Sequence, residues 1–334
     1  MLKPSGKTLR HLEKCILHDE LVNQESHKEE IKNKSLVPLL WDRPFNHGFI
    51  YTIYDEEMYL TYVRYSIMSL RMVHHYNNSK IMVFVEGKLW KKAKEELKGL
   101  LFDHDIVRVE GKAACYKQVI ACHPLIKDFE FCTFVDADLF FLGKQNSMNE
   151  PLTEVKNLLL NNPTSFVWAF SRKETPDVSH TFLHKRGREG TLRPHTYTWD
   201  LEEELEIDVE DLIRTETIWN ISFIFSFCPK RLQTDEYKAW ALYSMLDNNM
   251  CDESIWWLWS KKHNCKPYYW GNPGIPDLSI STTSHESKEK LHLFQPMFTD
   301  TLKKKIHRRY ETFMAILEIE NNYMDFINER IQQR

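Results

Sequence analysis

Apolar positions between residues 47 and 141 follow two alternating patterns. Short runs rich in β-branched and aromatic residues predict buried strands at residues 47–55, 80–87, 105–111 and 129–141. The segments between these runs carry apolar residues at helical spacing and predict helices at residues 56–76, 89–101 and 113–126. Strands and helices in alternation predict an α/β fold with a mostly parallel sheet.

The pattern is less regular after residue 141. Further strands are predicted at residues 165–170, 219–227 and 291–294, and further helices at 235–246 and 252–263. Residues 1–40 mix both signs of charge with scattered Leu and Ile and predict a helical N-terminal extension. Residues 300–334 predict an amphipathic C-terminal helix that packs on its own domain, with a partner or membrane surface as the minor alternative. Its apolar stripe consists of Leu302, Ile306, Tyr310, Phe313, Leu317 and Met324.

Composition narrows the class of protein. A formal net charge of -4 over 334 residues excludes a dedicated nucleic-acid binder, which would carry a basic excess. The seven cysteines form no CxxC pair, so neither a zinc ribbon nor a disulfide framework is indicated, and reduced thiols are expected. Aromatic residues make up 13% of the chain and include 10 Trp, which indicates a large core or, in part, carbohydrate-binding ring faces.

The chain carries no apolar segment of the kind that anchors a protein. Its first residues, MLKPSGKTLRHLEK, lack the apolar core of a signal peptide. No stretch approaches the ~18 uncharged apolar residues that a membrane span requires. We therefore expect no membrane span and a cytoplasmic location.

The sharpest chemical signal is the segment FCTFVDADLFF. In an extended chain, residues i and i+2 point to the same side, so Asp136 and Asp138 project together from the end of the predicted fourth strand. Two adjacent carboxylates repel each other, and a divalent cation such as Mn²⁺ or Mg²⁺ removes that cost while sharing its coordination with substrate phosphates. The alternative is an aspartate pair that only caps a turn.

Two other metal-dependent classes fit this segment poorly. Haloacid-dehalogenase phosphatases place the nucleophilic aspartate after the first strand with Thr four residues later, whereas Phe140 follows Asp136 at that distance. Exonucleases of the DEDD type use DxE rather than DxD.

Several short motifs in order resemble the GT-A-fold glycosyltransferases, and among them the glycogenin-like retaining family. The resemblance covers residues 49–294 and lies in IYTIYDEEMYLTYVRYSIMSL, YKQV, FVDADLFFLG, WNISFIFSFCP, DES and LHLF. It implies a GT-A (Rossmann-like) mixed, mostly parallel sheet flanked by helices, with the helical extensions at either end. The implied catalytic domain is 41–299, with a nucleotide-binding half (41–140) and an acceptor and donor-sugar half (141–299).

The resemblance also implies roles for individual residues. Tyr54 and Lys117 are expected to bind the nucleotide sugar together with Asp136 and Asp138. His292 in LHLF is implied as the third ligand of Mn²⁺ or Mg²⁺. The implied catalytic residues, which stabilise the sugar cation, are Asn220 and Asp252, with Glu253 where the family has Gln.

The implied reaction is transfer of a sugar from a nucleotide sugar, in this family usually a UDP-sugar, to a glycan or protein acceptor with retention of configuration. If the enzyme inverts instead, Asp252 or Glu253 is the natural general base. A sugar nucleotidyltransferase is a second hypothesis, although residues 50–59 lack its Gly-rich phosphate loop. A catalytically silent glycan-binding protein on the same fold is a third.

A long polar segment follows the predicted fifth strand. Residues 171–200 contain two Gly, two Pro and a local excess of Lys and Arg. A loop of this length inside a compact domain is usually either functional or disordered. It predicts a lid beside the acceptor cleft, with a solvated surface insertion as the alternative.

Overall fold

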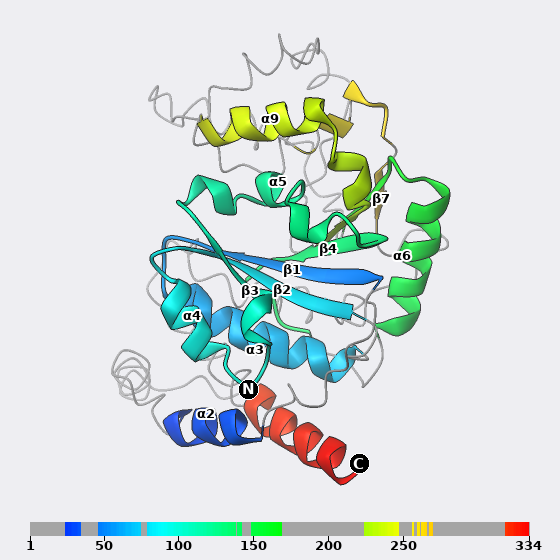
Figure 1. Ribbon diagram of the computed structural model, residues 1–334. Coiled ribbons are helices and arrows are strands. Elements are labelled where there is room, and N and C mark those ends of the chain that lie inside the picture. Colours follow the sequence, from blue (N-terminus) through cyan, green and yellow to red (C-terminus); the bar gives the residue numbers. More distant parts are fainter. Residues whose placement is uncertain are drawn as a thin grey trace, which may run out of the picture.

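A seven-stranded sheet between helical layers forms the centre of the protein (Figure 1). The computed structural model describes residues 24–34, 46–74, 79–137, 139–141, 148–168, 224–246, 256, 259–260, 262–265, 267–269 and 318–333. The strand order is β3-β2-β1-β4-β6-β5-β7. A single strand, β6, runs against its neighbours, so the predicted α/β class with a mixed, mostly parallel sheet is confirmed.

The parallel part of the sheet comes from the first half of the chain. It consists of β1 (His47–Ile53), β2 (Ser79–Glu86), β3 (Ile106–Val109) and β4 (Phe131–Val135). Most side chains of β1, β2 and β4 are buried, as expected for strands covered on both faces. The remaining strands are β6 (Ile224–Phe227), antiparallel to β4, then β5 (Phe166–Trp168) and β7 (Pro267–Tyr269).

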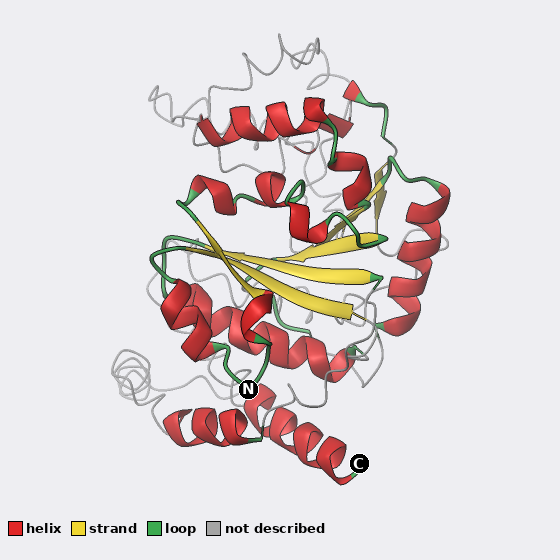
Figure 2. Ribbon diagram, viewed as in Figure 1, coloured by secondary structure: helices red, strands yellow, loops and turns green. Residues whose placement is uncertain are grey.

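Two hydrophobic cores lie on opposite faces of the sheet (Figure 2). Successive strand side chains point to opposite faces, so Phe49 and Tyr51 belong to one core and Ile50 to the other. The first, here the α3-face core, also takes in apolar residues of α3 (Met58–Val73), α4 (Trp90–Glu96) and α6 (Asn149–Asn161). The second, the α9-face core, is covered by α5 (Lys117–Ile120) and α9 (Asp235–Leu246).

The α9-face core is rich in aromatic rings. Trp256 is 1% exposed, and its ring centroid lies 4.6 Å from that of Phe225. Phe134 stacks on Phe227 at 5.3 Å, and Tyr237 meets Trp259 edge-on at 4.9 Å. These aromatic residues therefore belong to the hydrophobic core and are not carbohydrate-binding ring faces.

Helices near both ends of the chain pack side by side beneath α3 (Figure 1). They are α2 (Gln24–Asn33) and a helix over residues 318–332. Lys34 Nζ donates to Asn328 Oδ1 at 3.3 Å, and Ile31 and Tyr323 are fully buried in the α3-face core. Each predicted extension thus contains a helix in its described part, over residues 24–33 and 318–332. Met324 of the predicted apolar stripe is buried against the domain, while the other five members lie outside the described residues.

The predicted helix at 113–126 is wrong as a single element. The structure has three short pieces, η4 (Ala113–Cys115), α5 and η5 (Pro124–Ile126). Tyr116 is extended at φ -62° and ψ 137°, which separates the first two. His123 is extended because Pro124 follows it, and a residue before proline avoids the helical region.

The predicted helix at 89–101 ends earlier than expected, at Glu96. Gly99, three residues beyond this end, has a φ of +86°, a left-handed conformation that a right-handed helix cannot contain. A Cβ added at Gly99 would lie 3.2 Å from the Ile31 carbonyl oxygen, so this glycine also lets α2 approach closely.

Two elements were not predicted, α6 and β7. In addition, short 3-10 turns occur at η3 (Asp103–Asp105) and η7 (Pro229–Leu232). The strand predicted at 291–294 and the segment 171–200 lie outside the described residues. In the part of the chain that the structure describes, no helix has the length and apolarity needed to cross a bilayer.

Candidate active site

The carboxyl ends of β1 and β4 are neighbours in the middle of the sheet. The chain moves outward from β1 to β2 and β3, and then returns past β1 to form β4. Helices α3 and α4 cover one face along the outward path, whereas α5 lies on the other face on the return (Figure 1). Open α/β sheets bind ligands outside the carboxyl ends of strands at such a reversal. The residues after β1 and β4 are therefore the first candidates for a site.

Asp136 is the residue that directly follows β4. All five residues of that strand are buried, and the chain emerges from the core at the aspartate. The Lys117 ammonium, at the start of α5, donates to Asp136 Oδ1. The side chains of Lys117 and Asp136 keep 22% and 25% of their surface exposed. The two residues predicted to meet the diphosphate and its metal are thus in direct contact with each other.

Tyr54 follows β1 on the neighbouring strand. Its ring meets that of Tyr116 edge-on, with centroids 5.7 Å apart. Tyr116 is 2% exposed, and burial, followed by the charge of Asp55, raises the pKa of its hydroxyl to about 12. The Tyr116 hydroxyl therefore stays protonated at neutral pH. The half-buried Tyr54 presents the accessible part of this ring pair.

One short segment connects these groups. Residues 112–117, here the bridging segment, lead from β3 into α5. Its first residue, Lys112, pairs with Asp55, and its last, Lys117, pairs with Asp136. Between them, Tyr116 meets Tyr54. The bridging segment thus reaches from the end of β1 to the end of β4.

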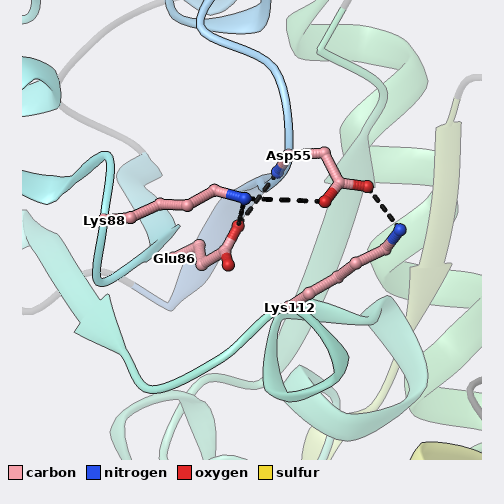
Figure 3. A network of polar contacts seen from close by, with 4 residues as sticks. All are labelled: Asp55, Glu86, Lys88 and Lys112. Carbon is pink, nitrogen blue, oxygen red and sulfur yellow. Dashed lines mark hydrogen bonds and ion pairs between the residues drawn. The ribbon is translucent and has the colours of Figure 1, made fainter.

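Four charged side chains form a second group at the same edge (Figure 3). The carboxylate of Asp55 forms ion pairs with two lysines: Lys88 Nζ lies 3.6 Å from Oδ1, and Lys112 pairs with Oδ2. The Asp55 backbone N–H donates to Glu86 Oε2 at 3.0 Å, and Lys88 lies 3.0 Å from the same oxygen. This group, the Asp55 network, joins the carboxyl ends of β1, β2 and β3 with balanced charge.

The sequence prediction missed the Asp55 network, although a signal was present. The tetrapeptide Val-Glu-Gly-Lys occurs twice, at 85–88 and 109–112. Each copy crosses the carboxyl end of a strand, β2 and β3 respectively. Strands β2 and β3 pair with Val85 opposite Arg108, and Gly87 N–H donates to the Val109 carbonyl at 2.8 Å. The register therefore brings both copies to the same edge.

A cysteine nucleophile is excluded at Cys115. This thiol lies in the bridging segment and is fully buried. Burial, followed by the charges of Glu86 and Asp55, raises its pKa to about 12. Because the thiolate is the reactive form, Cys115 is inert near neutral pH.

The reversed strand β6 brings a later part of the chain to this edge. Ile224, the first residue of β6, pairs with Val135, the last residue of β4. The chain therefore enters β6 next to Asp136. In a sheet of parallel strands alone, the entry to a strand would lie at the opposite edge.

Five predicted site residues lie outside the described residues: Asp138, Asn220, Asp252, Glu253 and His292. Of the three predicted metal ligands, the structure describes Asp136. The described residues contain no group of three or more His, Cys, Asp or Glu side chains able to hold a metal ion. Asp136 fits a cation chemically, because its carboxylate is a hard oxygen donor and a lysine ammonium already lies against it.

Comparison with known proteins gives structural likeness alone. The sequence matches no protein-family model and no curated protein. The mannosyltransferase Ktr4p from S. cerevisiae shares 11% identity with a TM-score of 0.36, and its complex with GDP shares 10% with a TM-score of 0.37; both comparisons cover 72% of this chain and 76% of Ktr4p. The bifunctional glycosyltransferase WbbM shares 12%, with a TM-score of 0.41, over 87% of this chain and 52% of WbbM.

These solved structures are glycosyltransferases, the class that the sequence motifs resemble. At TM-scores below 0.5, no residue role and no ligand is carried over from them to this chain.

Proposed function

We propose that this protein is a glycosyltransferase that moves a sugar from a nucleotide-diphosphate sugar to a glycan or protein acceptor. The observation that carries the proposal is the contact of Lys117 with Asp136 at the carboxyl end of β4, one strand from Tyr54. A carboxylate suited to a metal ion, an ammonium suited to phosphate and an aromatic ring suited to a nucleoside therefore share one sheet edge.

Sugar transfer from a nucleotide sugar requires groups that bind and stabilise the diphosphate. Breaking the anomeric C–O bond leaves negative charge on the departing diphosphate, and fixed positive groups stabilise that charge. In the proposed site, Lys117 exchanges Asp136 for a phosphate oxygen of the donor. Tyr54 supports the nucleoside on the β1 side.

Asp136 and Asp138, with His292, are the residues proposed to hold Mn²⁺ or Mg²⁺. Bound there, the ion supplies Lewis-acid stabilisation of the leaving diphosphate. The donor is proposed to be a UDP-sugar, on the resemblance stated above.

The second half of the chain is proposed to hold the donor sugar. The entry of β6 beside Asp136 supports Asn220 in this role, since this residue precedes Ile224 by four positions. Asp252 is proposed to stabilise the sugar cation of a retaining reaction. If configuration is inverted instead, Asp252 or Glu253 serves as general base.

Nucleotide binding with and without manganese tests the proposal directly. Wild-type protein is titrated with UDP and GDP by calorimetry, and each nucleotide sugar that binds is assayed for hydrolysis and transfer. Asp136→Asn and Asp138→Asn should weaken manganese-dependent binding by roughly tenfold to a hundredfold. The unfolding free energy of Asp136→Asn should change by no more than about 1 kcal/mol, because Asp136 is partly exposed.

A matched control is Asp128→Asn, an exposed aspartate that precedes the other end of β4. It should bind nucleotides as the wild type does. Undiminished activity in excess chelator contradicts the metal-dependent proposal. Pyrophosphate release from a nucleoside triphosphate would identify a nucleotidyltransferase, and donor binding without turnover a silent binding protein.

A further inference from the structure

Two lysines from the repeated Val-Glu-Gly-Lys segments converge on one aspartate. Lys88 ends the first copy and Lys112 the second, and they approach the two carboxylate oxygens of Asp55 from different strands (Figure 3). The glutamates of the two copies differ in their surroundings. Glu86 is 9% exposed and accepts the Asp55 backbone N–H, whereas the exposed Glu110 pairs with Arg108 at 2.7 Å.

Asp55 has an unusual backbone. Its φ of 64° is in the left-handed region, which costs free energy for a residue with a Cβ. Such a conformation persists where the surroundings fix it, and it occurs preferentially at functional sites. Here the fixing contacts are the hydrogen bond to Glu86 and the two lysine pairs.

Stability alone gives a weak reason for the lysine pairs. The side chains of Lys88, Asp55 and Lys112 keep 51%, 39% and 30% of their surface exposed. Ion pairs this accessible to water contribute little to folding. What they do fix is position, because Asp55 directly follows Tyr54 and Lys112 begins the bridging segment that carries Tyr116 and Lys117.

We propose that Asp55 is a positioning residue, which with Glu86, Lys88 and Lys112 sets the spacing between Tyr54 and the bridging segment before a nucleotide binds. Asp55 holds the turn after β1 on one side and the start of the bridging segment on the other. Fixing these two segments also fixes the distance between the Tyr54 and Tyr116 rings and keeps Lys117 in contact with Asp136. This inference rests on the proposed function, because the positioned groups are those assigned to the nucleotide.

Asp55→Gly tests positioning separately from stability. Glycine adopts a positive φ freely, so the variant removes the carboxylate without adding backbone strain. We expect the melting temperature of the ligand-free protein to be unchanged or higher, while the affinity for UDP or GDP with manganese falls roughly tenfold. Asp55→Asn should recover most of that affinity, because asparagine tolerates the left-handed region and its amide oxygen accepts from a lysine.

Two further variants sharpen the test. Lys112→Met should reproduce the loss seen with Asp55→Gly, and the double variant should lose little more than either single one, because both break the same contact. Glu110→Ala is the matched control: it alters the second Val-Glu-Gly-Lys copy outside the Asp55 network and should leave nucleotide affinity unchanged.

The outcomes separate this inference from the proposed function. Wild-type protein that binds neither UDP nor GDP, with or without manganese, overturns both. Wild-type binding that persists undiminished in Asp55→Gly overturns the positioning role and leaves the proposed function standing. A loss in Asp55→Gly that Lys112→Met does not share also overturns it, since the contact between Asp55 and the bridging segment would then not be what matters.

Discussion

The ammonium of Lys117 contacts the carboxylate of Asp136 and so joins the first residue of α5 to the residue that follows β4. Each side chain keeps about a quarter of its surface exposed, at 22% and 25%, so water and ions reach the pair. A pair of this kind is held weakly and exchanges partners readily. The lysine therefore neutralises the aspartate in the ligand-free protein and competes with any cation that approaches it.

Lys117→Met should separate metal binding from nucleotide binding. Without the competing ammonium, manganese alone should bind about as tightly as in the wild type or severalfold more tightly, because Asp136 loses its internal counter-ion. The affinity for UDP or GDP should fall, because a phosphate partner is lost. Manganese titration followed by nucleotide calorimetry measures both, with the exposed Lys127→Met as control. A parallel loss of manganese affinity would contradict this account.

Folding stability should fall in mild acid because of His47. Its ring is buried, with Nδ1 2.6 Å from Ser79 Oγ and Nε2 2.8 Å from Thr133 Oγ1. Burial, followed by the charge of His74, lowers the pKa of His47 well below its ordinary value. Below about pH 6.5 the imidazole of His47 is protonated in the unfolded chain but stays neutral in the folded protein. The free energy of unfolding therefore decreases as the pH falls, by up to about 1.4 kcal/mol per pH unit.

Urea unfolding between pH 7.5 and 5 measures this slope. His47→Gln should flatten it, whatever the variant does to stability at neutral pH. Burial also lowers the pKa values of His123 and His263, so part of the slope should remain. An equal slope in wild type and variant would contradict the assignment to His47.

One buried hydrogen bond should stabilise the packing of the helix over residues 318–332 against α3. Tyr65 Oη donates to Glu320 Oε1 at 2.6 Å, and the two residues are 0% and 1% exposed. Tyr65→Phe should lower the free energy of unfolding by about 2 kcal/mol, because the buried carboxyl group of Glu320 loses its hydrogen-bond donor. Replacing both partners, as Tyr65→Phe with Glu320→Leu, should recover part of the loss. Additive losses in the double variant would refute the pairing.

Asn220→Ala should impair transfer more than nucleotide binding. If Asn220 contacts the donor sugar, the rate of transfer should fall by roughly tenfold to a hundredfold while the affinity for UDP or GDP stays within about twofold. Steady-state kinetics and calorimetry on the same preparation give the comparison. An equal loss of transfer rate and nucleotide affinity would indicate that Asn220 contacts the nucleotide rather than the sugar.

Much of the parallel half of the fold could be predicted from sequence, for a physical reason. Strands such as β1 and β4 are covered on both faces, so they appear as short uninterrupted apolar runs. Helix α9 was predicted with its observed bounds because aromatic and aliphatic residues mark it clearly. The breaks at Tyr116 and His123 are backbone events that periodicity does not encode, and the three-residue β7 is shorter than the window in which a period can be recognised.

The position of one candidate site residue could be predicted from the sequence. Asp136 could be placed because an apolar strand leads directly into it. The Asp55 network could not be found by motif, because its members come from three strands whose neighbour relations are set by tertiary pairing. The repeated Val-Glu-Gly-Lys segments indicate a shared site only once β2 and β3 are known to be adjacent.

The difference in packing between individual tryptophans has an optical consequence. Trp256 is enclosed by Phe225 and Tyr237, whereas Trp90 lies half-buried on α4 with the Lys94 ammonium 4.6 Å from its ring. Rigidly packed rings give near-ultraviolet circular dichroism that disappears when tertiary packing loosens. The difference between the spectra of wild type and Trp90→Phe would isolate the contribution of this half-buried ring, so loosening of the packing around α4 could be followed by its loss.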